Sequence, residues 1–170
     1  AMDSEKHVIS LLVDNHTGVL SRVVGLFGRR GFNIDSLTVS ATDHPEVSRI
    51  TILVHGDAAI LRQIILQTDR LEETREVFAL ESADSLFREL LLLKVEADAS
   101  NRGELREIGS IYKAKIIDLS PGSMVIELTG EPEKIDAFLK MMEGYKVLEM
   151  CRTGITALER GGLHPHTSPI

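Results

Sequence analysis

The sequence predicts an α+β protein built of two consecutive units, each with the element order strand, helix, strand, strand, helix, strand. Short segments in which apolar and polar residues alternate indicate half-buried strands, and apolar residues at helical spacing lie between them. The same succession of periodicities occurs twice along the chain. Its 170 residues leave room for two small domains of roughly 75 residues each.

The first half of the chain supplies the first six elements. A strand over residues 8–13 precedes a helix with apolar positions 20, 23, 24 and 27, which Gly31 is well placed to end. Alternating positions 37–41 and 50–54 flank a turn at 43–45 and predict a hairpin. A second helix begins after Gly56-Asp57, and a strand over 77–80 closes the unit. The polar residues 81–85 predict a domain boundary.

The second half repeats this order. Its predicted strands cover residues 90–95, 115–119, 124–128 and 147–151, and its helices carry apolar positions 105–112 and 135–142. Each unit is a ferredoxin-like split βαβ arrangement, with two helices over one face of an antiparallel sheet. We therefore expect domains at 1–81 and 82–160, followed by a disordered tail at 161–170. Two such small sheets leave faces or edges to be covered, which favours oligomerisation or partner binding.

Composition excludes several classes of function. A net charge of −7 argues against a nucleic-acid partner, because phosphate binding needs clustered Lys and Arg. The single cysteine, Cys151, falls in a predicted strand, where we expect a small buried hydrophobe. No Cys/His cluster has zinc spacing, and His164 and His166 in the tail lack further ligands. With no apolar run approaching ~18 residues and no targeting peptide, a cytoplasmic protein without membrane association is expected.

The segment from Asp14 to Gly18, which links the first strand to the first helix, has a specific chemical capacity. The opening turn of a helix leaves backbone N–H groups unpaired at the positive end of its dipole. A glycine there lets a ligand carboxylate approach these groups, and the amide of Asn15 can accept from an ammonium or donate to a carboxylate. Such a site suits a free amino acid. The alternative is that Asn15 stabilises a turn and Gly18 relieves a steric clash.

Other residues near this helix also allow two interpretations. Asn33, just after the helix, could serve a ligand or could simply occupy a left-handed turn. Gly25 and Gly28 lie inside the helix and favour close packing against a neighbouring helix or chain, and they do not form a dinucleotide fingerprint. No phosphate loop and no Ser/His/Asp or Cys/His arrangement is present, so the sequence supports no catalytic residue and predicts a non-enzyme.

A family resemblance rests on specific segments of the chain. Residues 14–27 (DNHTGVLSRVVGLF), 30–39 (RGFNIDSLTV) and 48–51 (SRIT) resemble an ACT domain, and together they resemble the small regulatory subunit of acetolactate synthase, also called acetohydroxyacid synthase. The likeness extends from about residue 7 to 161. It is weaker in the second half, where the matching pieces are residues 116–118 (IID), 134–138 (KIDAF) and 152–154 (RTG).

The resemblance implies a regulatory subunit in branched-chain amino-acid biosynthesis. It would activate a separate catalytic subunit, which carries thiamine diphosphate, Mg²⁺ and FAD, and confer feedback inhibition by valine, or by leucine or isoleucine. No cofactor is expected on this chain. The effector would bind where two ACT domains form a homodimer, with Asn33 and Ile34 supplied by the partner chain. The implied effector-binding residues are Asn15, His16, Thr17, Gly18, Val19, Leu20, Asn33 and Ile34. The alternative function is a free-standing amino-acid sensor or interaction module without a synthase partner.

Overall fold

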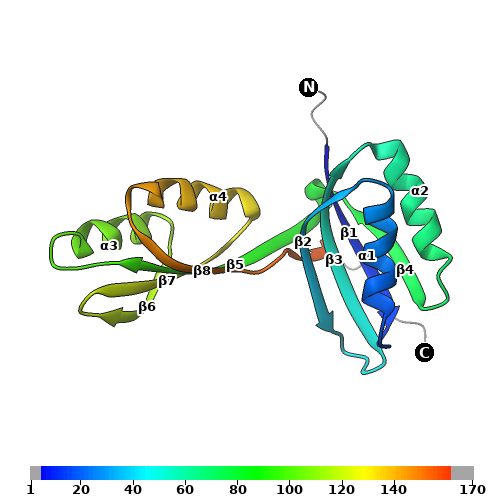
Figure 1. Cartoon of the computed structure of the whole chain (residues 1–170), viewed down its shortest axis with the longest axis horizontal. Helices are drawn as coiled ribbons and strands as arrows, with labels where there is room; N and C mark the ends of the chain where they lie inside the picture. Colours follow the sequence, from blue (N-terminus) through cyan, green and yellow to red (C-terminus); the bar gives the residue numbers. More distant parts are fainter. Residues whose placement is uncertain (1–4, 162–170) are drawn as a thin grey trace. The chain divides into compact units, whose positions relative to one another are not determined.

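The computed structural model describes residues 5–161, which form two compact units. The first unit contains residues 5–86 and 154–161, and the second contains residues 87–153 (Figure 1). Each unit has an antiparallel sheet with two α-helices, so the predicted α+β fold with two ferredoxin-like units is confirmed. The expected boundaries differ, because the structure groups residues 154–161 with the first unit rather than the second. Residues 162–170, most of the predicted tail with both of its histidines, lie outside the described residues.

The first unit has the predicted order of strands and helices. Its sheet has the order β2-β3-β1-β4, and every pair is antiparallel. The six elements are β1 (Glu5–Asp14), α1 (Val19–Arg29), β2 (Asn33–Ala41), β3 (Val47–Gly56), α2 (Ala58–Asp69) and β4 (Thr74–Leu80).

Alternation along the strands divides the sheet of the first unit into two faces. On the helix face, Ile9, Leu11 and Val13 of β1 join Ile50, Ile52 and Val54 of β3 in one buried cluster with α1 and α2. The strand register places a second set on the opposite face, in four-residue rows across the sheet. We call this set the back face. Its three rows are Ser36, Leu53, Val8 and Leu80; Thr38, Thr51, Ser10 and Phe78; and Ser40, Arg49, Leu12 and Glu76.

The two helices of the first unit begin differently. Asp57 caps α2, because its carboxylate accepts hydrogen bonds from the N–H groups of Ala59 at 2.8 Å and Ile60 at 3.3 Å. Gly18 precedes α1 with no side-chain cap and with φ of 90°. At the other end of α1, Gly31 has φ of 76°, so it ends the helix in the left-handed conformation that the sequence predicts.

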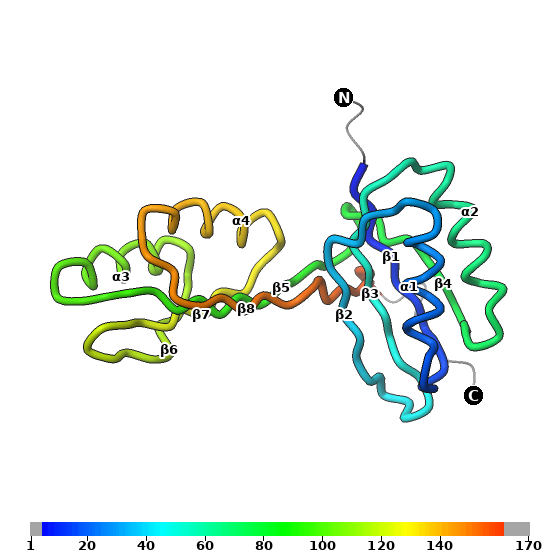
Figure 2. The backbone as a smooth tube through the Cα atoms, viewed as in Figure 1, coloured from blue at the N-terminus to red at the C-terminus, as the bar shows by residue number. Residues whose placement is uncertain are grey.

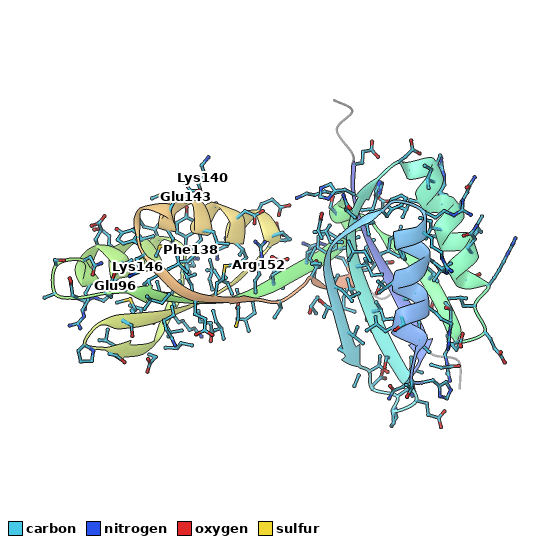
Figure 3. The ribbon with its side chains drawn as sticks, viewed as in Figure 1. Glu96, Phe138, Lys140, Glu143, Lys146 and Arg152 are labelled. Atoms are coloured by element: carbon cyan, nitrogen blue, oxygen red, sulfur yellow. The ribbon has the colours of Figure 1, made fainter. Side chains whose placement is uncertain are left out.

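The second unit repeats the topology, with the sheet order β6-β7-β5-β8. Alternate residues of its central strands are buried against the two helices, together with Phe138, which lies between α4 and the sheet, whereas Lys140 and Glu143 lie on the outer side (Figure 3). Its elements are β5 (Ser85–Glu96), α3 (Arg102–Ile111), β6 (Lys115–Ser120), β7 (Ser123–Gly130), α4 (Pro132–Met141) and β8 (Val147–Arg152). One 3-10 turn, η2 (Met142–Gly144), completes it, whereas another, η1 (Ser82–Asp84), belongs to the first unit.

The polar stretch 81–85, which is the predicted domain boundary, contains η1, and Ser85 begins β5 with only 5% of its surface exposed. The two units divide just after this stretch, between Leu86 and Phe87. Two features differ from the sequence prediction. Cys151 is exposed, because β8 is an edge strand of its sheet, so the expected burial is wrong. A further short strand, β9 (Thr156–Glu159), follows β8 and pairs with β5. Within the described part of the chain, no helix has the length and apolar character to cross a membrane.

Candidate effector site

The loop between β1 and α1 lies at one end of the first unit's sheet, where the chain reverses direction (Figure 2). The N–H of Asn15 donates to the carbonyl of Glu46 at 2.9 Å, which ties the loop to the β2–β3 connection. Gly18 follows in the left-handed region, where a residue with a Cβ would be strained. The backbone conformation alone therefore gives a structural reason for a glycine at position 18. This glycine also leaves the start of α1 without a side-chain cap, and Nη1 of Arg22 lies 3.5 Å from where a Cβ on Gly18 would stand.

The start of α1 has an unused capacity for an anion. The N–H of Val19 donates to the carbonyl of His16 at 3.4 Å, but no side chain caps the first turn and no acidic residue occupies it. His16, Thr17 and Gly18 are exposed, so this end of the helix is open to solvent in the single chain. Backbone donors and a positive helix dipole at an accessible position are what a carboxylate requires.

Two ion pairs surround the loop, and the sequence prediction missed both. Asp14 pairs with Arg75 at 2.6 Å, and Arg22 pairs with Glu73. Each pair joins the β1–α1 region to residues more than 50 positions away in the chain, so no local pattern could have indicated them. They neutralise the charged side chains beside the loop. The helix dipole and backbone N–H groups are thus left as the main attraction for a ligand carboxylate.

The side chain of Asn15 makes no hydrogen bond with any described residue, and it is exposed. This weighs against the turn-stabilising interpretation, in which its amide would bond the nearby backbone. Asn33 is also not in a left-handed turn: it is the first residue of β2, where it pairs with His55. The purely conformational explanation for Asn33 therefore fails.

The predicted apolar residues of the site separate into different environments. Val19 is only 3% exposed and belongs to the core cluster, so its side chain is not available to a ligand. Leu20 is 38% exposed beside it. Ile34 is half-buried and packs against the same core. Among the described residues, a Cβ on Gly25 would meet only Arg29 of the same helix and one on Gly28 would meet nothing within 4 Å, so neither glycine is needed for close packing against another described element.

The predicted site residues do not all come together in one chain. Residues 15–20 lie at the end of the sheet where Asp14 pairs with Val47, whereas Asn33 pairs with His55, eight positions further along β3. At ~3.3 Å per residue these positions are about 26 Å apart. Asn33 and Ile34 therefore cannot contact a ligand held by Asn15 and Gly18 of the same chain. Among residues 5–161, no cluster of His, Cys, Asp and Glu could hold a metal ion.

Both halves of the chain match models of the same protein family. Residues 9–76 match a family model described as the AHAS small subunit-like ACT domain, and residues 88–161 match one described as the small subunit of acetolactate synthase. A solved structure of the acetolactate synthase small subunit from Thermotoga maritima is 37% identical in sequence. It superimposes with a TM-score of 0.85 over 94% of this chain and 99% of that one.

Curated relatives are similar over nearly their full lengths. A probable acetolactate synthase small subunit from Archaeoglobus fulgidus is 46% identical over 92% of this chain and 98% of its own. The acetolactate synthase small subunit from Mycolicibacterium smegmatis is 43% identical over 91% of each chain. With this identity, coverage and shared fold, the chain belongs to the acetolactate synthase small subunit family, and its first unit is an ACT domain.

Proposed function

We propose that this chain activates the catalytic subunit of acetolactate synthase and makes it sensitive to valine, which binds at the start of α1. The observation that carries the proposal is the open N-terminus of α1, where Gly18 leaves the first-turn N–H groups uncapped. The ligand carboxylate would receive hydrogen bonds from the backbone of residues 18–20. The free side-chain oxygen of Asn15 would accept one from the ligand ammonium.

The site needs two chains, and the sheet topology supports this. β2 is an edge strand of the first unit's sheet, with Val39 46% exposed, so a second copy can extend the sheet there. In an antiparallel pairing centred on Leu37, the partner's Asn33 lies opposite Ala41. Ala41 pairs with Ser48, and Ser48 with Val13, one residue before Asp14. The partner's Asn33 and Ile34 would then reach the end of the sheet that carries Asn15 and Gly18.

Regulation follows from this placement. Catalysis would belong to the other subunit, with thiamine diphosphate, Mg²⁺ and FAD, and this chain would contribute no reacting group. An effector held between two ACT domains binds one arrangement of the domains more tightly than others, and that difference is the coupling free energy. Leucine or isoleucine would bind in the same pocket if the pocket accepts a side chain larger than that of valine.

Ligand binding is tested by thermal unfolding of the full chain with and without effector. Valine at millimolar concentration should raise the Tm, because it binds the folded state only. Gly18→Asp should abolish the rise, because a carboxylate at that position repels the ligand carboxylate and occupies its space. Gly31→Asp is the matched control: Gly31 also has a positive φ, with open space where a Cβ would stand. A full valine response in Gly18→Asp would reject this placement of the site.

The second candidate function is a free-standing amino-acid sensor without a synthase partner. It is favoured only by the ACT domain itself. Mixing the purified chain with the acetolactate synthase catalytic subunit separates the two functions. A rise in acetolactate formation, reversed by valine, is expected for the regulatory subunit, and no rise would favour the sensor.

A further inference from the structure

The back face of the first unit is covered by the segment that follows the second unit in the sequence. We call residues 154–160 the latch. Ile155 and Ala157 are 2% and 4% exposed, whereas Thr156 is exposed and Leu158 is 60% exposed. This alternation places one side of the latch against the protein and the other in solvent. Beneath it the back-face residues Ser10, Leu12 and Thr51 are nearly inaccessible, at 0%, 3% and 4%.

Specific contacts hold the latch in place. Nη2 of Arg49 donates to the carbonyl of Ala157 at 3.0 Å, and the guanidinium lies 5.4 Å from the ring centre of Phe78 on the same face. At one end, a Cβ on Gly154 would lie 2.4 Å from Oγ1 of Thr38 and 3.0 Å from the carbonyl oxygen of Leu37. At the other end, the N–H of Arg160 donates to the carbonyl of Asp84 at 2.7 Å.

The contact surface is nevertheless poorly matched. Several buried polar atoms on or beside the back face have no hydrogen-bond partner among the described residues: Oγ of Ser10, Ser36 and Ser85, Oγ1 of Thr38, and Nε of Arg49. Each such atom gives up its hydrogen bonds to water on burial, at a typical cost of about 1–3 kcal/mol. A permanent core avoids such groups. A short strand lying over several of them can therefore leave and return with a small change in free energy.

The latch sits on the strands that carry the proposed effector loop. Leu12 and Arg49 are paired with each other, and both line a cavity of about 260 Å³. Leu158 of the latch and residues 41–44 of the β2–β3 turn complete its lining. Leu12 lies two residues before Asp14 in β1, and Arg49 lies two residues after Val47 in β3. Asp14 and Val47 are themselves paired, and Asn15 is bonded to Glu46. Fixing Leu12 and Arg49 thus restricts the backbone from which the effector loop departs.

From this arrangement we propose that the latch is a reversible regulatory element, closed over the back face when the effector is bound and more often open when it is not. The proposal rests on the proposed effector site. Because linkage is reciprocal, the effector stabilises the closed latch, and an open latch weakens effector binding by leaving the loop less ordered. Since the latch follows the second unit in the chain, its state can be passed to that unit through the covalent connection.

The test compares adjacent residues of β9 in the full-length protein. Ala157→Glu places a carboxylate against the back face and should open the latch, whereas Thr156→Glu places the same charge in solvent. Deuterium uptake of the peptide spanning the latch is followed by mass spectrometry, and valine affinity by calorimetry. In the wild type and in Thr156→Glu, saturating valine should slow latch exchange at least threefold. In Ala157→Glu, uptake should rise and the Kd for valine should increase about fivefold.

Other outcomes separate the two proposals. Valine binding that leaves latch exchange unchanged overturns the latch proposal, as does an open latch in Ala157→Glu with an unaltered Kd. If none of valine, leucine and isoleucine binds the wild type by calorimetry, the proposed effector site fails and the latch coupling fails with it. Arg49→Met serves if Ala157→Glu does not fold, because it removes the hydrogen bond to Ala157 while keeping the aliphatic stem. It should shift latch exchange and the valine Kd in the same directions.

Discussion

Glu89 shows how much a single residue can depend on contacts remote in sequence. The residue is 4% exposed, and its carboxylate accepts hydrogen bonds from Nε and Nη2 of Arg152 at 2.9 and 2.6 Å. Nη1 of Arg152 donates to Asp136 at 2.7 Å. Burial acts to lower the pKa of Arg152, but the hydrogen bonds and charges of Asp136 and Glu89 outweigh it and raise that pKa. The sequence singled out Arg152 only by family resemblance, since the pairing joins residues 63 positions apart.

The two acidic partners of Arg152 should differ in their effect on stability. Glu89→Ala removes the buried partner and should lower the free energy of unfolding by about 3 kcal/mol. Asp136→Ala removes a partner whose side chain is 57% exposed and should cost about 0.5 kcal/mol. Urea unfolding monitored by tyrosine fluorescence measures the free energy of unfolding of the second unit alone, because both tyrosines, Tyr112 and Tyr145, lie there. Equal losses in the two variants would contradict the assignment.

At the scale of elements, the two helices of the first unit differ in how their starts are satisfied. Asp57 fills the donors at the start of α2 with its own carboxylate, whereas Gly18 leaves those of α1 open. A helix start with its own side-chain cap has few unpaired N–H groups to offer a ligand. The difference is one of residue type, because Asp has a side-chain acceptor for these N–H groups and Gly has none. The sequence could not show that the loop is held by Glu46 of the β2–β3 connection or flanked by two ion pairs.

Removing the cap of α2 should therefore destabilise the fold without altering the affinity for the ligand. Asp57→Ala is expected to lower the free energy of unfolding by about 1 kcal/mol, because two N–H groups lose their acceptor. Asp43→Ala, in the hairpin turn with its side chain 86% exposed, should change it by less than about 0.5 kcal/mol. Differential scanning calorimetry reports both values. Valine affinity should be unchanged in each variant, and a loss in Asp57→Ala would show that α2 takes part in the site.

At the scale of the whole molecule, the first unit is discontinuous in sequence. The chain leaves it within β5, after Leu86, and re-enters it at Gly154. The first unit therefore acquires its back-face cover only after the second unit has been synthesised. The β2 edge and the outer surfaces of the helices in the first unit remain available for the second copy and for the catalytic subunit that we propose as partners.

Deleting the latch should weaken the first unit selectively. A chain ending at Thr153 exposes back-face residues such as Val8, Leu12 and Leu80, so it should bind a hydrophobic dye and lose thermal stability in the first unit. A chain ending at Gly161 keeps the latch and should match the full-length protein. Tyrosine fluorescence should show the second unit unfolding at the same urea concentration in both. Identical dye binding by the two truncated chains would show that the latch does not protect the back face.

The sequence by itself determined the order of the six main elements in each unit and the start and end of α1, where the residues that we propose meet a carboxylate lie. These follow from local chemistry, namely the spacing of apolar residues and the conformational freedom of Gly18 and Gly31. Tertiary structure decided the remainder. It placed Asn33 about 26 Å from the loop in the same chain, exposed Cys151 at a sheet edge, and returned residues 154–160 to the first unit. The physical reason is that each outcome depends on which strands become neighbours, and local periodicity does not encode strand pairing between distant segments.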